Sequence, residues 1–321
     1  MFSTIFSNVA SGDLLLSITL LVGSGIFAGF IAGLFGIGGG VVVVPALYYI
    51  FTLAEIDESI RMHLAVGTSL ANIVPISIIS AINHHRRGSV DLNFLKFIFL
   101  SVFVGVVFGS IAVSSLEGSS LILIYSIILF FVALQFFVWK DEWNLANKFP
   151  KNFIGHGYGS TIGFLSVIIG VGGGSLSIPV LKLYNFDIRR AIGTAAGIGS
   201  IVAIPGTIGF MIAGIQNDVS LPLTYGYVSL VGLILITPMT IIGAPLGVRF
   251  AHYISREKLS FIFGLWLFIR ILIVPPDSEF ANMQQDLLSM GSFSLTFALG
   301  LIGYIFTILV LGLFIKVKSR K

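Results

Sequence analysis

The chain of 321 residues has no cysteine and few charged residues, which make up only 10% of it. Without cysteine it has no thiolate metal site, iron–sulfur cluster or redox dithiol. A soluble domain carries about a quarter charged residues, and so few charges cannot cover a globular surface of this size. These absences exclude a soluble enzyme, a nucleic-acid-binding protein and a secreted disulfide scaffold.

Hydrophobic sequence is abundant instead, at 56% of the residues with a mean hydropathy of +1.04. Apolar stretches long enough to cross a bilayer recur from end to end. We therefore predict an all-α polytopic membrane protein. The stretches run approximately over 14–51, 64–82, 92–114, 120–139, 153–184, 191–213, 223–248, 259–274 and 292–315.

Acidic residues are missing from the interiors of these stretches. All 14 of them lie in linkers or at segment edges. A carboxylate at the centre of a bilayer costs about 2.5–3.5 kcal/mol, so one that is kept there is usually functional. Its absence weighs against a carboxylate-built Na⁺ or H⁺ site and suits a pathway for anions.

Basic residues are concentrated in alternate linkers, which marks those linkers as cytoplasmic rather than as a nucleic-acid-binding face. On this assignment 14–51 and 153–184 each enter and leave on one face, as hairpins that dip into the membrane. Three crossings follow each hairpin, so the second set is inverted relative to the first. A spanning helix over 14–35 followed by a half-helix is the alternative for the first hairpin. The basic linkers contain Arg86, Arg87, Lys140, Lys148, Lys151, Arg189, Arg190, Arg249, Arg256 and Lys258.

The predicted organisation has four parts. Residues 1–139 form the first repeat, 140–152 a cytoplasmic linker, and 153–274 the second, inverted repeat. Residues 275–321 hold an extracytoplasmic linker, an extra C-terminal crossing and a basic tail. The N-terminus is predicted outside the cell and the C-terminus in the cytoplasm.

Internal similarity supports the duplication without using the charges. The run Gly36–Gly40 recurs as Gly170–Gly174, and Pro45 recurs as Pro179 at the same spacing. A Gly-Thr pair at 67–68 recurs at 193–194, at a slightly shorter spacing. Inverted repeats of this kind are typical of secondary transporters.

The two triple-glycine runs, Gly38–Gly40 and Gly172–Gly174, are predicted to be the tips of the hairpins. Irregular backbone survives at membrane depth only where protein buries it or it lines a cavity. A short helix that begins after each tip directs its N–H groups and its positive end at the membrane centre, which favours an anion. Helix packing is the alternative for glycines at helical spacing, such as Gly25, Gly29 and Gly33 or Gly155, Gly159 and Gly163. Neither run matches a dinucleotide-binding or phosphate-loop motif.

Polar side chains within the apolar segments are further candidates, because hydroxyl and amide groups donate to an oxyanion. Singly, such a residue more often forms an interhelical hydrogen bond. No catalytic, metal or cofactor constellation lies within the membrane segments. The predicted substrate-binding residues are Gly38, Gly39, Gly40, Thr68, Ser69, Gly172, Gly173, Gly174, Ser175 and Thr194, with Asn72, Gln135, Ser177 and Ser200 as weaker candidates. Two further residues, His63 and Arg189, are predicted at helix mouths on opposite faces, where they either attract anions or anchor helix ends.

The stretch Gly-Leu-Phe-Gly-Ile-Gly-Gly-Gly-Val-Val-Val-Val-Pro at 33–45 resembles the sulfite exporter TauE/SafE family, also called TSUP or DUF81. Its partial repeat, Ile-Gly-Val-Gly-Gly-Gly-Ser-Leu-Ser-Ile-Pro at 169–179, shares this likeness, and the Gly-Thr stretches at 63–70 and 190–195 support it. The resemblance covers roughly 14–274. It does not extend to the final crossing at 292–315.

The resemblance implies that this protein moves a small sulfur-containing anion, such as sulfite, thiosulfate or an organosulfonate. It also implies a place in the bacterial inner membrane, with the lipid bilayer as partner and export as the direction. An importer, a carrier of a carboxylate or phosphonate, and a non-transporting subunit that anchors a membrane enzyme complex are the alternatives.

Overall fold

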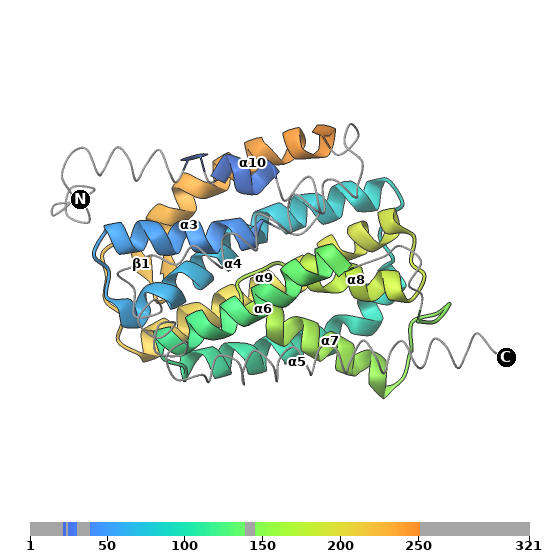
Figure 1. Cartoon of the computed structure of the whole chain (residues 1–321), viewed down its shortest axis with the longest axis horizontal. Helices are drawn as coiled ribbons and strands as arrows, with labels where there is room; N and C mark the ends of the chain where they lie inside the picture. The colour runs from blue at the N-terminus through green and yellow to red at the C-terminus, as the bar shows by residue number, and fades with distance from the viewer. Residues whose placement is uncertain (1–21, 24, 31–38, 139–144, 251–321) are drawn as a thin grey trace.

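The structure is a computed structural model that describes residues 22–23, 25–30, 39–138 and 145–250. As predicted, this part of the chain is mostly helical (Figure 1). Residues 25–30 are helical as well. The elements that follow are α3 (Gly40–Leu53), α4 (Glu58–Arg86), α5 (Leu92–Ser114), α6 (Gly118–Val138), α7 (Phe153–Ile168), α8 (Gly174–Leu183), α9 (Ile188–Gln216), β1 (Thr224–Tyr225), β2 (Val228–Ser229) and α10 (Leu230–Phe250).

Three of these helices, α4, α5 and α9, are long and apolar enough to cross a membrane. They confirm the helices predicted over 64–82, 92–114 and 191–213. The 29 residues of α4 and of α9 extend over about 43 Å at a rise of 1.5 Å per residue, which exceeds the roughly 30 Å of a hydrocarbon core. The crossings predicted at 259–274 and 292–315 lie outside the described residues.

Two predicted boundaries are wrong. The segment predicted as a crossing over 223–248 begins as the antiparallel hairpin of β1 and β2, and its helix starts only at Leu230. The hairpin forms because Gly226 takes the left-handed conformation, with φ of 55°, that such a turn requires. The other difference is at the end of α4, which continues past the predicted limit of 82 to Arg86 and includes His84 and His85 in its last turn.

Carboxylate or amide side chains cap the N-termini of four helices. Asp57 accepts a hydrogen bond from Ser59 N at the start of α4, and Asp91 accepts one from Phe94 N at the start of α5. The Ser59 hydroxyl and amide both donate to Asp57 and hold its pKa below the usual value. Asn152 and Asp187 cap α7 and α9 in the same way. Such caps stabilise a helix end by about 1 kcal/mol.

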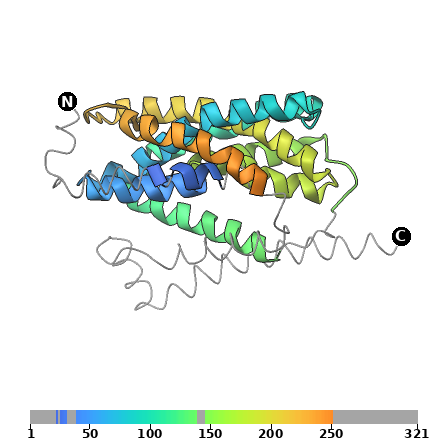
Figure 2. The same ribbon diagram turned by 90° about the horizontal axis from the view of Figure 1, so that it is seen from above.

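The helices α3 and α8 differ from the others in length and in how they begin. They have 14 and 10 residues, and 10 residues extend only about 15 Å, so α8 reaches halfway through a membrane. In Figure 1, α3 runs from the middle of the molecule to its left end, and α8 runs from the middle towards the right end. Figure 2 shows the long helices lying side by side along the same axis.

The hairpin predicted over 153–184 is present as α7, a turn at the glycines, and α8. For the predicted hairpin over 14–51, the described parts are residues 22–23, 25–30 and α3 with its N-cap Gly39. The choice between a hairpin and a spanning helix followed by a half-helix falls on segments outside the described residues.

The short helices α3 and α8, called the half-helices below, each contain a proline beyond the first turn. Pro45 and Pro179 are each the sixth residue of their helix. At that depth a proline leaves the carbonyl four residues earlier without its helical donor. For Pro45 this is the carbonyl of Val41, which instead accepts a hydrogen bond of 3.5 Å from the Tyr125 hydroxyl of α6.

Candidate functional site

Each half-helix starts from a glycine in a left-handed conformation. The φ angle is 70° at Gly39 and 41° at Gly173, the N-cap residues of α3 and α8. Neither N-cap provides a side-chain hydrogen bond, unlike the caps of α4, α5, α7 and α9. The first-turn N–H groups of both half-helices therefore have no side-chain cap, and of these groups Val42 N and Gly174 N donate to the backbone carbonyls of Gly39 and Gly172.

The two glycine tips lie against each other. A Cβ added to Gly40 would overlap the carbonyl oxygen of Gly170 and lie 3.0 Å from Val171 Cα. The side chain of Ile73 from α4 packs over both tips, because a Cβ on Gly40 or on Gly172 would lie 3.1 or 2.7 Å from it. The structure thus brings together the predicted residues of the two runs, apart from Gly38, which lies outside the described residues.

Serine side chains surround the second tip. Ser69 of α4 is fully buried and donates a hydrogen bond of 2.9 Å to the Gly170 carbonyl, so its hydroxyl is bound to the tip. The hydroxyls of Ser175 and Ser177 in α8 are buried and have no hydrogen-bond partner within the described part of the chain. An unpaired buried hydroxyl costs about 1–3 kcal/mol. Because residues two apart point to nearly opposite sides of a helix, Ser175 and Ser177 face different surroundings.

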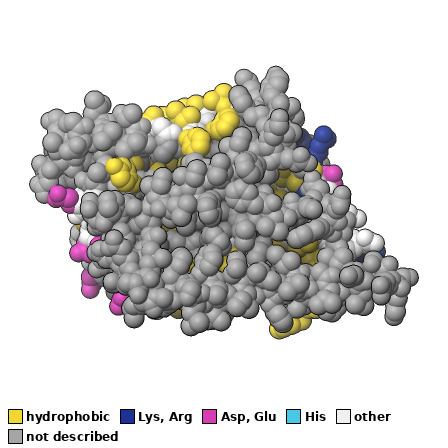
Figure 3. Space-filling model, in the orientation of Figure 1, with side chains coloured by type: hydrophobic (Ala, Val, Ile, Leu, Met, Phe, Trp, Pro, Cys, Tyr) yellow, Lys and Arg dark blue, Asp and Glu magenta, His cyan; other side chains and the backbone are white. Residues whose placement is uncertain are grey.

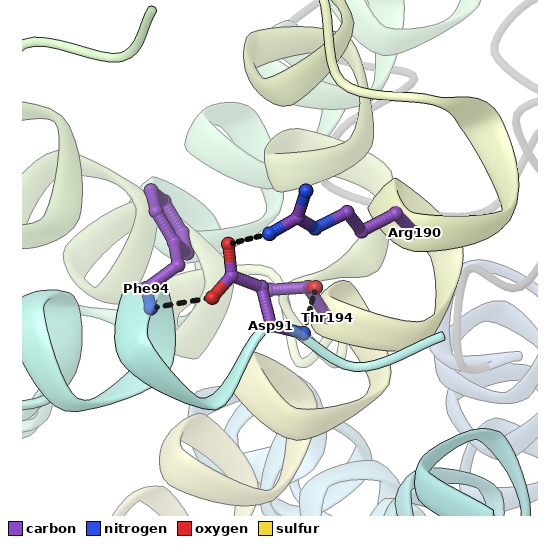
Figure 4. A network of polar contacts seen from close by, with 4 residues as sticks. All are labelled: Asp91, Phe94, Arg190 and Thr194. Carbon is purple, nitrogen blue, oxygen red and sulfur yellow. Dashed lines mark hydrogen bonds and ion pairs between the residues drawn. The ribbon is translucent and has the colours of Figure 1, made fainter. Parts of the chain in front are cut away.

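The buried hydroxyls of Thr68 and Thr194 are not turned towards the tips. Thr194 of α9 accepts a hydrogen bond of 3.0 Å from Asp91 N, directly before α5 (Figure 4). Thr68 of α4 accepts one of 2.9 Å from Ser229 N, directly before α10. Each threonine therefore holds the start of a helix from the other half of the chain.

These two contacts match each other, and so do the side-chain caps formed by Asp91 and Ser229. Asp91 accepts a hydrogen bond from Phe94 N, three residues on, and Ser229 accepts one of 3.2 Å from Gly232 N, also three residues on. The glycines before the two threonines complete the match. A Cβ on Gly67 would overlap the Tyr227 carbonyl oxygen, and one on Gly193 would lie 2.5 Å from the Ser89 carbonyl oxygen.

Of the glycines predicted to pack helices together, Gly25 and Gly29 lie against α10, and Gly159 and Gly163 lie against α5, again in matching positions. Gly155 lies instead against the carbonyl oxygen of Pro150, in the segment before its own helix, and Gly33 lies outside the described residues. A Cβ on Gly29 would overlap the carbonyl oxygen of Thr240 in α10. Gly163 is the counterpart of Gly29 at the spacing of the two glycine runs, and a Cβ on it would overlap the carbonyl oxygen of Val102 in α5. The first helical segment of each half therefore packs on a helix of the other half.

The same crossings contain a reciprocal pair of glycines that the sequence analysis missed. A Cβ on Gly105 of α5 would overlap the Ser160 carbonyl oxygen, and one on Gly243 of α10 would overlap the Ile26 carbonyl oxygen. Ile26 and Ser160 are separated along the chain by the same spacing as Gly29 and Gly163. The pair could have been found from the spacing between Gly105 and Gly243, which is slightly longer than that of the glycine runs and also relates Asp91 to Ser229.

Extra helical turns explain why the spacing between matching residues shortens from the glycine runs to the Gly-Thr pairs. The half-helix α3 is four residues longer than α8. Gly67 is the tenth residue of α4, whereas Gly193 is the sixth residue of α9. One additional turn in each of α3 and α4 thus accounts for the shorter spacing of the Gly-Thr pairs relative to the glycine runs.

Acidic side chains lie mostly at one end of the molecule and basic side chains at the other (Figure 3). One end joins the linkers around 54–59, 114–118 and 217, through contacts such as Asn217 Nδ2 to Ser114 O at 3.4 Å. The opposite end joins 86–91, 145–152 and 183–193, for example through Leu145 N to Leu183 O at 2.7 Å. The first, called the acidic end below, carries Glu55, Asp57, Glu58, Glu117 and Asp218 with Arg61; the basic end carries Arg86, Arg87, Lys148, Lys151, Lys182, Arg189 and Arg190 with Asp91 and Asp187.

His63 and Arg189 lie at these two ends, as predicted, but in different environments. Arg189 is exposed at the basic end. His63 is 2% exposed, its Nε2 lies 3.2 Å from the Val113 carbonyl oxygen near the end of α5, and its ring stacks on Tyr227 at 4.8 Å. His63 therefore anchors a helix end rather than facing solvent. Among the described residues, no group of three or more His, Asp or Glu could hold a metal ion.

The described residues therefore define an α-helical membrane protein in which two short helices meet at buried glycine tips. The chain belongs to the sulfite exporter TauE/SafE family, whose family model matches residues 21–273. This confirms the resemblance carried by the glycine motifs.

Curated relatives agree with this assignment. A probable membrane transporter protein of Haemophilus influenzae is 31% identical over 253 residues, which is 78% of this chain and 94% of the relative. One of Methanocaldococcus jannaschii is 29% identical over 266 residues, 79% of this chain and 95% of the relative. One of Bacillus subtilis is 26% identical over 222 residues, 63% of this chain and 81% of the relative. No solved structure matches the chain.

Proposed function

We propose that the protein exports a small sulfur-containing anion, such as sulfite, thiosulfate or an organosulfonate, across the bacterial inner membrane by alternating access. The observation that carries the proposal is the meeting of two uncapped half-helix N-termini at the glycine tips. N-terminal N–H groups and the positive ends of the helices stabilise an anion there. The name of the family supplies the sulfur chemistry.

Alternating access requires two halves that exchange roles, and the matching contacts support such a pair. We assign the repeats to 1–139 and 153–274, joined by the linker 140–152 and followed by 275–321. The half-helix of the first repeat ends at the acidic end and that of the second repeat ends at the basic end, which is the arrangement of inverted repeats. By the positive-inside rule the basic end faces the cytoplasm, with the N-terminus outside and the C-terminus inside.

The charge distribution suits an anionic cargo. In the described helices, the only acidic residue is Glu58, at the start of α4. An anion at the tips therefore meets N–H groups and hydroxyls and no carboxylate. A membrane potential that is negative inside favours its exit by about 2.3 kcal/mol per charge per 100 mV, so export needs no further energy source in this scheme.

Purified protein in liposomes tests the proposal directly. Vesicles loaded with sulfite or thiosulfate are expected to release it faster than protein-free vesicles, and faster still when the potential drives anions outward. Flux of a carboxylate or phosphonate in place of every sulfur anion would reassign the substrate. Uptake without release would reverse the direction, and a lack of flux for all anions would leave a non-transporting subunit.

Ser175 is expected to contribute to anion binding without contributing to folding. Ser175→Ala removes a hydroxyl that has no hydrogen-bond partner among the described residues, so thermal stability is expected to stay unchanged or to rise slightly. The apparent affinity for the anion is expected to fall about three- to tenfold, the equivalent of one hydrogen bond. Ser110→Ala is the matched control, since the Ser110 hydroxyl of α5 is also buried without a hydrogen-bond partner in the part of the chain that the structure describes, but packs on Gly209 of α9. Equal transport by both variants would remove Ser175 from the site.

A further inference from the structure

The contact between Thr194 and Asp91 at the basic end and the matching contact between Thr68 and Ser229 at the acidic end differ in charge. At the basic end, Asp91 Oδ2 also forms an ion pair of 2.8 Å with Arg190 Nη2 in the first turn of α9 (Figure 4). At the acidic end, the equivalents are Ser229 and the buried Leu64, which cannot form an ion pair. Only one of the two matching contacts is therefore held by charge.

The ion pair joins the two proposed repeats at a place where they have to separate. Asp91 precedes α5 of the first repeat, and Arg190 and Thr194 belong to α9 of the second. We propose that Asp91, Arg190 and Thr194 form the gate that closes the basic end, and that this end opens when the Asp91–Arg190 pair breaks. The proposal rests on the alternating-access function proposed above.

The pair can break without unwinding either helix. Asp91 uses Oδ1 to cap α5 and Oδ2 to bind Arg190, so the cap persists when the arginine leaves. Arg190 also lies over the ring of Phe186, 5.7 Å from its centroid, which leaves it a partner in the open state. The first turn of α9 keeps its own cap, because Asp187 accepts from Arg189 N at 2.9 Å.

The exposure of the pair is suitable for a contact that opens in every transport cycle. The side chain of Arg190 is 57% exposed and that of Asp91 is 14% exposed. Ion pairs in such positions are weak and are screened by salt. They therefore shift the balance between closed and open states by about two- to fivefold without locking the closed one.

Cysteine labelling tests the gate, because the chain has no cysteine of its own. Ser77→Cys is the reporter: Ser77 is 7% exposed and packs beside Gly199, which in turn neighbours Gly172 of the second tip. A membrane-impermeant maleimide is added to vesicles from the basic side. Asp91→Asn keeps a capping side chain and removes the charge, and Arg190→Gln removes the other partner.

Each of these variants is expected to speed labelling of the reporter about two- to fivefold. The double variant is expected to add nothing further, because both changes break one contact. Raising the salt concentration is expected to speed labelling when both partners are present and to have little effect on Asp91→Asn. Unchanged labelling rates in both single variants would overturn the proposal.

A second reporter, Ser110→Cys, distinguishes opening of the gate from a general loosening of the fold. Ser110 of α5 is 7% exposed and lies four residues before Ser114, near the acidic end. Its labelling from the acidic side is expected to stay the same or to fall in Asp91→Asn. Faster labelling at both reporters would show that the pair only stabilises the fold and would also overturn the gate. The labelling experiment needs no substrate. If labelling responds as expected but the protein moves no sulfur anion in liposomes, the proposed substrate is wrong and the proposed gate stands.

Discussion

Replacing Gly163 by alanine is expected to prevent the protein from folding stably, whereas the same change at Gly157 in the same helix is expected to be tolerated. A Cβ on Gly163 would overlap the Val102 carbonyl oxygen of α5, and a Cβ on Gly157 would meet nothing within 4 Å. Overpacking typically costs about 1–3 kcal/mol and occasionally more. The obstacle here is backbone, which cannot rotate away as a side chain does, so α7 has to move off α5 and the cost is expected at the upper end of this range or beyond.

Gly157→Ala is expected to stabilise the protein slightly, by about 0.5–1 kcal/mol, since alanine is the better helix former. The measurement is the yield of monodisperse protein in detergent, followed by thermal unfolding of the two variants. A parallel pair exists near the start of the described residues. A Cβ on Gly29 would overlap the Thr240 carbonyl oxygen, and a Cβ on Gly23 would meet nothing within 4 Å. If Gly163→Ala or Gly29→Ala folds as well as the parent chain, the close contact of Gly163 with α5 or of Gly29 with α10 is contradicted.

The helices and the glycine tips were predictable because both leave a local signal. Apolar stretches of membrane length predicted the crossings that became α4, α5 and α9, and the repeated Gly-Gly-Gly runs predicted that the short helices α3 and α8 start at glycines. The β1–β2 hairpin was missed because its Leu-Thr-Tyr-Gly-Tyr sequence is apolar enough to continue a crossing. Hydropathy averages over such a stretch and does not register the turn at Gly226.

The partners of the predicted site residues were not predictable from one sequence. A threonine that binds a substrate and one that accepts a backbone N–H from a neighbouring helix have the same local pattern, and the structure places Thr68 and Thr194 in the second role. The small-residue stripes predicted close packing but gave no partner. Which helix lies opposite Gly29 or Gly163 depends on how the halves interlock, and no local periodicity encodes that.

The interlocking of the halves also explains why the tips meet. Each entering helix lies on a helix of the other half, and each Gly-Thr pair holds the start of one. The half-helices that follow are thereby brought to the same depth from opposite ends. Any motion that parts the halves at one end is then expected to alter the contact between Gly40 and Gly170, which would couple the proposed anion site to the ends of the molecule.

Replacing Gly40 by alanine is therefore expected to lower transport strongly in the fraction of protein that still folds. The added Cβ would overlap the Gly170 carbonyl oxygen, so the two tips would have to separate and their N–H groups would no longer face one anion. Overpacking of about 1–3 kcal/mol corresponds to a loss of about five- to 150-fold, since about 1.4 kcal/mol is a factor of ten. Anion flux in liposomes, normalised to the amount of folded protein, measures the effect.

Gly199→Ala is the matched control for Gly40→Ala. Gly199 lies beside the second tip, but a Cβ there would sit 3.4 Å from Ser77 Cβ and 3.5 Å from the Gly172 carbonyl oxygen, which is ordinary van der Waals contact. Transport by this variant is expected to stay near that of the parent chain. Because both changes add one methyl group near the same tip, a loss confined to Gly40→Ala identifies the contact between the tips as the requirement. Full activity in Gly40→Ala would show instead that the anion does not need both half-helices at once.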